Sequence, residues 1–336
     1  MKHRSLGRTG LKVSELCLGT MTFGVQCDEA QSFAILDRAA AGGIDFLDTA
    51  DCYPIPLNLE TVGRTEEILG RWLEGKRDRF VVATKCFFPM GPGPNDRGNS
   101  RRHILKSVDA SLRRLRTDWI DLFQVHAFDP ETPLEETLGA LDDVVRAGKV
   151  RYAGCSNFLA WELGESLAVS ERRGLVRFDC IQPRYNLLHR DIETDLLPLC
   201  RSRGVGVIVF NPLAGGLLTG KHLPGRTPDP GTRFGDRLGE SNVIYRRRYW
   251  QQESLEAIQG LKTLFDRRNM SLTTAVVSWV LAQPGVTSAI VGASRPDQLE
   301  ATLAASGMVL DEEAQAALGD VWFNLPRQRP GGGPVR

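Results

Sequence analysis

Short apolar segments alternate with amphipathic helical patterns along most of this chain, and the number of those segments constrains the fold more than any other feature. Eight of them have the length and composition of β-strands, at residues 15–19, 43–49, 80–85, 120–126, 150–156, 180–185, 205–211 and 288–292. They are apolar on both sides of the pleat, as parallel strands covered on both faces are. Eight strand-then-helix units predict an α/β fold, specifically a closed (β/α)8 TIM barrel.

The alternative is an open, doubly wound parallel sheet. Such sheets usually carry a GxGxxG sequence after the first strand when they bind a dinucleotide. Here the first strand runs into Leu-Gly-Thr-Met-Thr-Phe-Gly at residues 18–24, which lacks that spacing. The closed barrel is therefore preferred, with the open sheet as the second choice.

Two helical patterns between the strands are especially regular. Residues 100–115 and 134–147 each place apolar side chains on one helical face. Ser100 is expected to cap the first helix, Pro133 to open the second in its first turn and Gly148 to close it. The apolar sets are Ile104, Val108, Leu112 and Leu115, and Leu134, Leu138, Leu141 and Val145.

Three segments fall outside the strand-helix repeat. Residues 3–12 hold Gly-Arg-Thr-Gly between two short polar strands, which predicts an N-terminal β-hairpin that plugs the bottom of the barrel. Residues 213–249, after the seventh strand, are rich in Gly, Pro and Arg and predict a long loop of the kind that carries function. Residues 326–336 are rich in Gly and Pro and are expected to be disordered. One barrel domain is thus predicted over residues 1–325.

Charge and cysteine content exclude several classes of partner. Lys and Arg number 42 and Asp and Glu 41, so the net charge is +1 and favours neither nucleic acid nor an anionic membrane. The seven cysteines are spread singly, which fits a reduced, cytoplasmic setting without a zinc or other metal site. The N-terminus has no apolar signal core, and the longest apolar run, residues 205–210, is far shorter than the ~20 residues of a membrane span.

Polar side chains end three consecutive predicted strands. Asp48 and Tyr53 follow the second strand, Lys85 ends the third and His126 ends the fourth. The carboxyl ends of barrel strands line active sites, so these four side chains should meet at one rim. Reduction of a carbonyl group needs a hydride on carbon and a proton on oxygen. A tyrosine hydroxyl can give that proton if a lysine ammonium lowers its pKa.

The other two groups complete this chemistry. A buried lysine needs an anion, which Asp48 can supply, and His126 can hydrogen-bond the substrate oxygen. Each residue alone has an ordinary structural explanation, as a surface lysine, a core histidine or a packing tyrosine. Their joint occurrence at consecutive strand ends favours a catalytic site.

From about residue 6 to residue 303 the sequence resembles the aldo-keto reductases, in particular bacterial members and the related potassium-channel β subunits. The resemblance is carried by residues 18–24, 48–53, 65–70, 83–85, 124–126, 148–157, 185–188, 212–221 and 292–299. It implies an (α/β)8 barrel that binds NADP(H) in an extended form. It also implies a catalytic tetrad of Asp48, Tyr53, Lys85 and His126, with Tyr53 as general acid.

The resemblance further implies how the cofactor is held. Ser156, Asn157 and Gln182 are expected to bind the nicotinamide carboxamide, with Tyr185 stacked on the ring. The glycine-rich segment 212–221 should follow the pyrophosphate, with Lys221 supplying charge and Arg233 as a clamp or a solvated loop charge. The other residues expected to contact the cofactor are Gly19, Thr20, Met21, Asn211, Leu213, Gly215, Gly292, Ser294, Arg295 and Gln298.

NADPH is preferred to NADH on the residues after the last strand. Ser294 and Arg295 precede a helix expected to start at Pro296, and a helix N-terminus with a hydroxyl and a guanidinium suits a 2′-phosphate. The chain departs from the family at Ala301 and Thr302, where Glu-Asn is usual, and also at Asn211 and Arg184. An outward-facing salt bridge is expected for Arg184.

The favoured function is NADPH-dependent reduction of a small-molecule aldehyde or ketone. The expected pocket walls are Phe23, Ile55, Phe87, Phe88, Phe128 and Trp250. Alternatives are a cofactor-binding regulatory subunit, a reductase of a nucleotide-linked sugar, and a lyase that uses Lys85 as a Schiff-base nucleophile. The run Arg246-Arg247-Arg248 fits recognition of a phosphorylated substrate, a solvated helix start or an anchor for the cofactor loop. The oligomeric state is left open.

Overall fold

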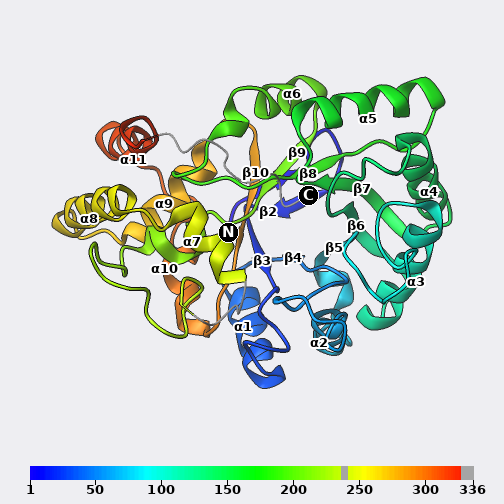
Figure 1. Cartoon of the computed structure of the whole chain (residues 1–336), viewed down its shortest axis with the longest axis horizontal. Coiled ribbons are helices and arrows are strands. Elements are labelled where there is room, and N and C mark those ends of the chain that lie inside the picture. Colours follow the sequence, from blue (N-terminus) through cyan, green and yellow to red (C-terminus); the bar gives the residue numbers. More distant parts are fainter. Residues whose placement is uncertain (236–240, 327–336) are drawn as a thin grey trace.

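The computed structural model, which describes residues 1–235 and 241–326, is built around a closed barrel of eight parallel strands (Figure 1). The strands follow one another around the barrel, and β10 pairs with β3 to close it. They are β3 (Leu16–Gly19), β4 (Phe46–Asp48), β5 (Val81–Cys86), β6 (Ile120–Val125), β7 (Val150–Ser156), β8 (Cys180–Gln182), β9 (Gly206–Val209) and β10 (Val286–Val291). The predicted (β/α)8 barrel is confirmed, and the open sheet is excluded.

Helices surround the strands on the outside of the barrel (Figure 1). Ser100 caps α3 as predicted, its hydroxyl accepting from the His103 amide. Pro133 stands at the N-cap of α4 rather than in its first turn, and Val144, rather than Val145, is buried. The helices are α1 (Glu29–Ala41), α2 (Arg64–Leu73), α3 (Arg101–Leu115), α4 (Leu134–Arg146), α5 (Ala160–Arg173), α6 (Leu196–Arg203), α7 (Ser241–Tyr249), α8 (Gln252–Arg267), α9 (Leu272–Ala282), α10 (Glu300–Leu303) and α11 (Glu312–Asn324).

Two predicted features differ in the structure. The segment 213–249 is not a plain loop, because it contains a 3-10 helix (Ala214–Thr219) and α7. The helix expected from Pro296 is a 3-10 turn (Pro296–Leu299) that runs into the four-residue α10. Of the predicted tail, residues 327–336 lie outside the described residues. No helix in the described part of the chain combines the length and the apolar character that a membrane crossing requires.

Alternation along the strands divides the core into two sets. Outward side chains such as Leu47 and Val82 pack under the helices in the larger core. Inward side chains fill the lower barrel as a separate cluster: Cys17, Phe46, Ala83, Leu122, Cys180 and Ile208. Because side chains alternate with a period of two, the next inward residue on each strand lies one layer higher, towards the carboxyl ends.

The N-terminal hairpin closes the bottom of the barrel, as predicted. β1 (His3–Ser5) pairs antiparallel with β2 (Lys12–Ser14), and the turn between them carries Leu6 into the inward cluster, where it is fully buried. The backbone of Gly7 approaches Gly206 so closely that a Cβ on Gly206 would lie 2.7 Å from the Gly7 nitrogen. The amino end of the barrel is therefore filled, and only the carboxyl end is open to chemistry.

Candidate active site

The alternation of the strands selects the side chains that face the barrel interior at its carboxyl end. Counting up in twos from the inward cluster leads from Phe46 to Asp48, from Ala83 to Lys85 and from Leu122 through Gln124 to His126. The same count on β8 leads from Cys180 to Gln182. The predicted tetrad residues on β4, β5 and β6 therefore do converge.

Asp48 and Lys85 form a buried ion pair at the centre of this layer. The Lys85 ammonium donates to Asp48 Oδ2 at 2.6 Å and to the Thr49 carbonyl at 2.7 Å, and its side chain has no exposed surface. The other oxygen of Asp48 accepts from the amide of Gln182 at 2.8 Å. Gln124, which sequence reasoning missed, lies 3.4 Å from the same oxygen. A buried charge pair of this kind fixes the position of Lys85.

Tyr53 lies above this pair and against His126. The two rings meet edge to face with centroids 5.9 Å apart, and Lys85 Nζ lies 5.2 Å from the centre of the Tyr53 ring. The Tyr53 side chain is half-buried, whereas His126 is only 8% exposed. The structure thus brings all four tetrad residues together.

Electrostatics at Tyr53 differ from the expectation that Lys85 lowers its pKa. Burial, reinforced by the negative charge of Asp48, raises the pKa of Tyr53 well above its usual value. Asp48, 2.6 Å from the Lys85 ammonium, offsets part of that positive charge at the phenol. Tyr53 therefore keeps its proton at neutral pH, which suits a proton donor.

His126 is held in its neutral form. Burial and the positive charge of Lys85 place the pKa of His126 well below its usual value. Its Nδ1 is buried and has no hydrogen-bond partner among the described residues. A neutral imidazole offers one donor and one acceptor, so His126 can hydrogen-bond a substrate oxygen without adding a charge.

Three amide and hydroxyl side chains meet beside His126. Ser156 Oγ donates to the Gln182 carbonyl at 2.8 Å, and Asn157 Nδ2 donates to Ser156 Oγ at 3.1 Å. Asn157 also donates to the His126 carbonyl at 3.0 Å from a left-handed backbone, φ 58°. The residues predicted to hold a nicotinamide carboxamide are thus adjacent to one another and to the tetrad.

Tyr185 does not reach this site. It is three residues after Gln182, an odd number, so it points outward, where it is fully buried and stacks on Trp279 of α9. Its hydroxyl donates to Glu193. Phe210 is the aromatic residue that sequence reasoning missed: it follows β9, two residues after the inward Ile208, and is half-buried. Phe210 could have been found from the sequence, because inward side chains recur at every second position of a strand.

The glycine-rich turn after β9 has the shape of an anion cradle. Gly215 and Gly216 have positive φ, and a Cβ on Gly216 would lie 3.7 Å from Lys221 Nζ. A hydrogen bond accounts for the departure from the family pattern at Asn211. Its Oδ1 accepts from the Gly215 amide at 2.6 Å and so stabilises the turn. Leu213 is the half-buried residue that precedes this turn. Close backbone and a nearby ammonium fit a pyrophosphate.

Arg233 and Gly292 extend this cradle to the end of β10. A Cβ on Gly292 would lie 3.9 Å from a terminal nitrogen of Arg233, and the positive charge of Arg233 opposes the rise in the pKa of Tyr53. Arg233 therefore reaches across the mouth. Beyond it, the Gln298 side chain accepts from the Ser294 amide at 2.9 Å, and Arg295 pairs with Asp297, both exposed.

The remaining predicted residues lie around this layer. Gly19 ends β3, and a Cβ there would lie 2.7 Å from the Ile290 side chain. Thr20 is fully buried and donates to the Asp48 carbonyl at 3.0 Å. Met21 is half-buried beside the Tyr53 loop, its carbonyl accepting from the Ile55 amide at 3.3 Å. Thr302 is buried and donates to the Leu299 carbonyl at 2.9 Å.

Aromatic residues line only part of the expected pocket. Phe88 is half-buried and lies edge to face with His126, centroids 4.9 Å apart. Phe23 is fully buried in the outer core, so its prediction as a pocket wall is wrong. Trp250 packs against Phe234 in the segment that follows β9, with ring centroids 5.1 Å apart.

Comparison with known proteins agrees with this geometry. A model of the aldo/keto reductase family matches residues 15–322. The chain belongs to the aldo/keto reductase family.

Three relatives show how far the similarity extends. The chain is 40% identical over 329 residues to the uncharacterized oxidoreductase YrpG of Bacillus subtilis (strain 168), covering 96% of each chain. It is 36% identical over 314 residues to a probable voltage-gated potassium channel subunit beta of Arabidopsis thaliana, covering 92% of each. It is also 36% identical over 307 residues to the L-glyceraldehyde 3-phosphate reductase of Escherichia coli (strain K12), covering 89% of this chain and 86% of that one.

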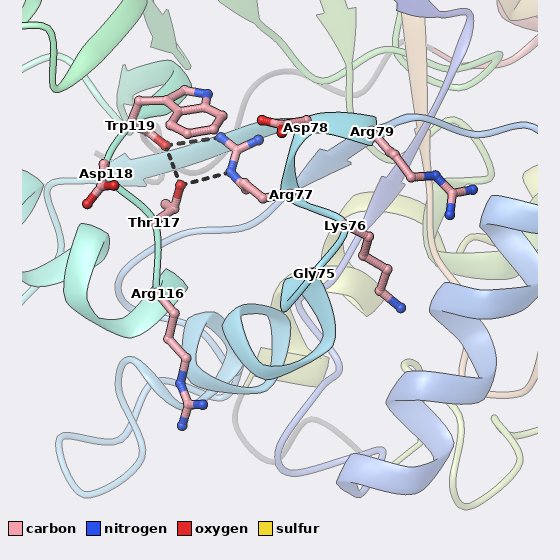
Figure 2. A pocket seen from close by; sticks show the side chains of 9 residues that line it. All are labelled: Gly75, Lys76, Arg77, Asp78, Arg79, Arg116, Thr117, Asp118 and Trp119. Atoms are coloured by element: carbon pink, nitrogen blue, oxygen red, sulfur yellow. Dashed lines mark hydrogen bonds between the residues drawn. The ribbon is translucent and has the colours of Figure 1, made fainter.

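A pocket of about 460 Å³ in this aldo/keto reductase is lined by residues 75–79 and 116–119 and does not include Asp48, Tyr53, Lys85 or His126 (Figure 2). Its walls come from the segments before β5 and β6, so it lies at the amino end of the barrel. Arg77 crosses it and donates to Thr117 Oγ1 at 3.1 Å, to the Trp119 carbonyl at 3.0 Å and to Asp121 at 2.6 Å. Arg77 therefore has a structural role in this pocket, because its hydrogen bonds connect the two segments that form the walls. Within the described residues, no cluster of His, Cys, Asp and Glu could hold a metal ion.

Proposed function

We propose that this aldo/keto reductase reduces aldehydes or ketones to alcohols with NADPH, with Tyr53 as the proton donor. The observation that carries the proposal is the arrangement at the barrel mouth. A protonated Tyr53 lies against a neutral His126, with the buried Lys85–Asp48 pair beneath its ring.

The chemistry divides among these residues. The nicotinamide cofactor, when bound, supplies the hydride. Tyr53 gives its hydroxyl proton to the carbonyl oxygen, and His126 hydrogen-bonds that oxygen and orients it. The phenolate left on Tyr53 is stabilised by the Lys85 ammonium, 5.2 Å from the ring. Asp48 holds that ammonium in place.

The same layer supports cofactor binding. Ser156, Asn157 and Gln182 offer amide and hydroxyl groups for the carboxamide, and Phe210 takes the stacking position first expected for Tyr185. Lys221 and Arg233 flank glycines that allow close approach of a pyrophosphate. Preference for NADPH rests on Arg295, whose pairing with Asp297 is exposed to solvent and so is readily replaced by a 2′-phosphate.

The test is the loss of NADPH absorbance with para-nitrobenzaldehyde, with NADH in parallel. We expect turnover that favours NADPH, and a loss of at least about 100-fold in kcat for Tyr53→Phe with NADPH binding retained. The control is Tyr152→Phe, because Tyr152 packs against the lower, inward cluster. Wild-type turnover by Tyr53→Phe would refute the proton-donor role.

One alternative is favoured by a specific observation, the similarity to a probable potassium channel subunit beta. A cofactor-binding regulatory subunit would need the same site. It would bind NADPH tightly but turn over no aldehyde, and it would be recovered from cells with a stable protein partner. Turnover without such a partner favours the reductase.

A further inference from the structure

Arg184 lies at the barrel mouth, one layer above Gln182. It is two residues after Gln182, and the pairing of β8 with β9 continues this far, because Arg184 forms a bridge with Phe210. The alternation of the strand therefore places Arg184 on the same side as Gln182. Two residues of strand put it about 7 Å further out along the barrel.

Helix α7 carries Arg248 into the neighbourhood of Arg184. The next residue, Tyr249, is fixed by the strand ends, because its hydroxyl accepts from Asn186 Nδ2 at 3.2 Å and from Asn211 Nδ2 at 2.9 Å. Burial and the charge of Arg184 lower the pKa of Arg248. Burial, with Arg184 and Arg248, also lowers the pKa of His189 to about 3. The two guanidinium groups thus lie close enough to act on each other and on His189.

Neither arginine forms an ion pair with a carboxylate among the described residues: the carboxylate at this group, the exposed Asp191, lies 3.4 Å from His189 Nδ1. Arg184 lies 3.2 Å from His189 Nδ1, and the outward salt bridge expected for it is not formed. Several other half-buried arginines are paired, among them Arg77 with Asp121 and Arg190 with Glu193. Two partly buried like charges without an ion-pair partner destabilise the fold unless an anion binds them.

We propose that Arg184 and Arg248 bind an anionic group, a phosphate or a carboxylate, carried by the carbonyl substrate at the end remote from its reacting carbon. The inference rests on the proposed reductase function and names its substrate class. The cofactor has its own cations, Lys221 and Arg233, on the β9 and β10 side of the mouth. Planar guanidinium groups favour phosphate and carboxylate oxygens because they can donate two parallel hydrogen bonds.

The first experiment compares matched substrates that differ only in the anion. The pairs are the phosphate ester of glyceraldehyde against glyceraldehyde, and succinic semialdehyde against butanal. We expect kcat/KM to be about 10- to 100-fold higher for the anionic member of at least one pair. The pair that shows the preference identifies the anion as phosphate or carboxylate. Equal values in both pairs would overturn the proposal.

Variants then assign the preference to these residues. Arg184→Gln and Arg248→Gln should each bring the ratio of anionic to neutral kcat/KM towards one. Arg247→Gln should keep the ratio, because Arg247 is an exposed neighbour on the same helix. If Arg184→Gln instead weakens NADPH binding and keeps the ratio, the two arginines serve the cofactor and the proposal is wrong.

A binding measurement separates this proposal from the reductase function. If none of the four aldehydes reacts, the proposed function fails, but anion binding remains measurable with inorganic phosphate. Phosphate should raise the thermal midpoint of the unsubstituted protein and of Arg247→Gln, and less so that of Arg184→Gln. Equal shifts in all three proteins, or no shift in any, would overturn the anion site.

Discussion

Removing the charge of Asp48 is the perturbation for which this structure gives the sharpest expectation. Asp48→Asn preserves the shape of the side chain and the oxygen that accepts from Gln182 and Gln124. It replaces the other oxygen, now 2.6 Å from Lys85 Nζ, with an amide group that is itself a donor. The Lys85 ammonium, with no exposed surface, then faces a donor and keeps only the Thr49 carbonyl.

The magnitude follows from the burial of both partners. Breaking a buried ion pair by removing one charge costs about 3–5 kcal/mol, because the other charge is left uncompensated. For a chain of this size about 2 °C of melting temperature is lost per kcal/mol, so the midpoint should fall by roughly 6–10 °C. Lys85→Met should cost a similar amount, since it leaves the Asp48 carboxylate buried without its cation.

The double variant tests the reasoning, because it buries neither charge. Asp48→Asn with Lys85→Met should be more stable than the sum of the two single losses by about 3 kcal/mol. The assay is urea unfolding followed by tryptophan fluorescence, with kcat measured on the same samples. All three variants should lose reduction. Losses of stability that simply add would show that the two charges are not coupled as the geometry indicates.

Three other expectations concern pH, the barrel floor and the cofactor ring. The protonated form of Tyr53 is the reactive one and its pKa is raised, whereas the pKa of His126 is lowered. The value of kcat/KM for reduction should therefore be flat from about pH 6 to 9 and fall only above pH 9. A fall centred near pH 7 would contradict both shifts. Leu6→Ala should lower the free energy of unfolding by about 2–5 kcal/mol with kcat unchanged, because Leu6 is fully buried in the floor; an equally stable variant would show that the hairpin is not a plug. Tyr185→Phe should lose about 1–3 kcal/mol of stability with the bond to Glu193 and leave the Kd for NADPH unchanged, whereas Phe210→Ala should raise that Kd about 2- to 10-fold. The reverse outcome would restore Tyr185 as the stacking residue.

The barrel could be predicted because its signal is repeated. Each of the eight predicted strands overlaps a strand of the structure, although several predicted ends differ from the observed ones, as in 43–49 against Phe46–Asp48 and 288–292 against Val286–Val291. Hydrophobic segments identify where a strand lies, whereas its ends depend on which neighbours pair with it. A helix was predicted to start at Pro296, but its first turn is 3-10. Helix α7 was missed because a short helix leaves little periodic pattern.

The tetrad could be located because its residues end successive strands, but their electrostatics could not be predicted. The sequence places Lys85 near Tyr53, which favours a lowered pKa, and does not reveal that Asp48 offsets the lysine charge at 2.6 Å. Tyr185 is a different case. Its place one residue out of phase with Gln182 was readable in the sequence, and Phe210 was in phase with Ile208.

The closure of the barrel between β3 and β10 has a consequence for synthesis of the chain. β3 ends at Gly19, whereas its second neighbour begins at Val286. At the usual rate of translation, β10 leaves the ribosome on the order of tens of seconds after β3. During that time one edge of the first barrel strand has no native hydrogen-bond partner. A message truncated before β10 would yield a polypeptide with two permanently open strand edges, on β3 and β9, each able to recruit another nascent chain.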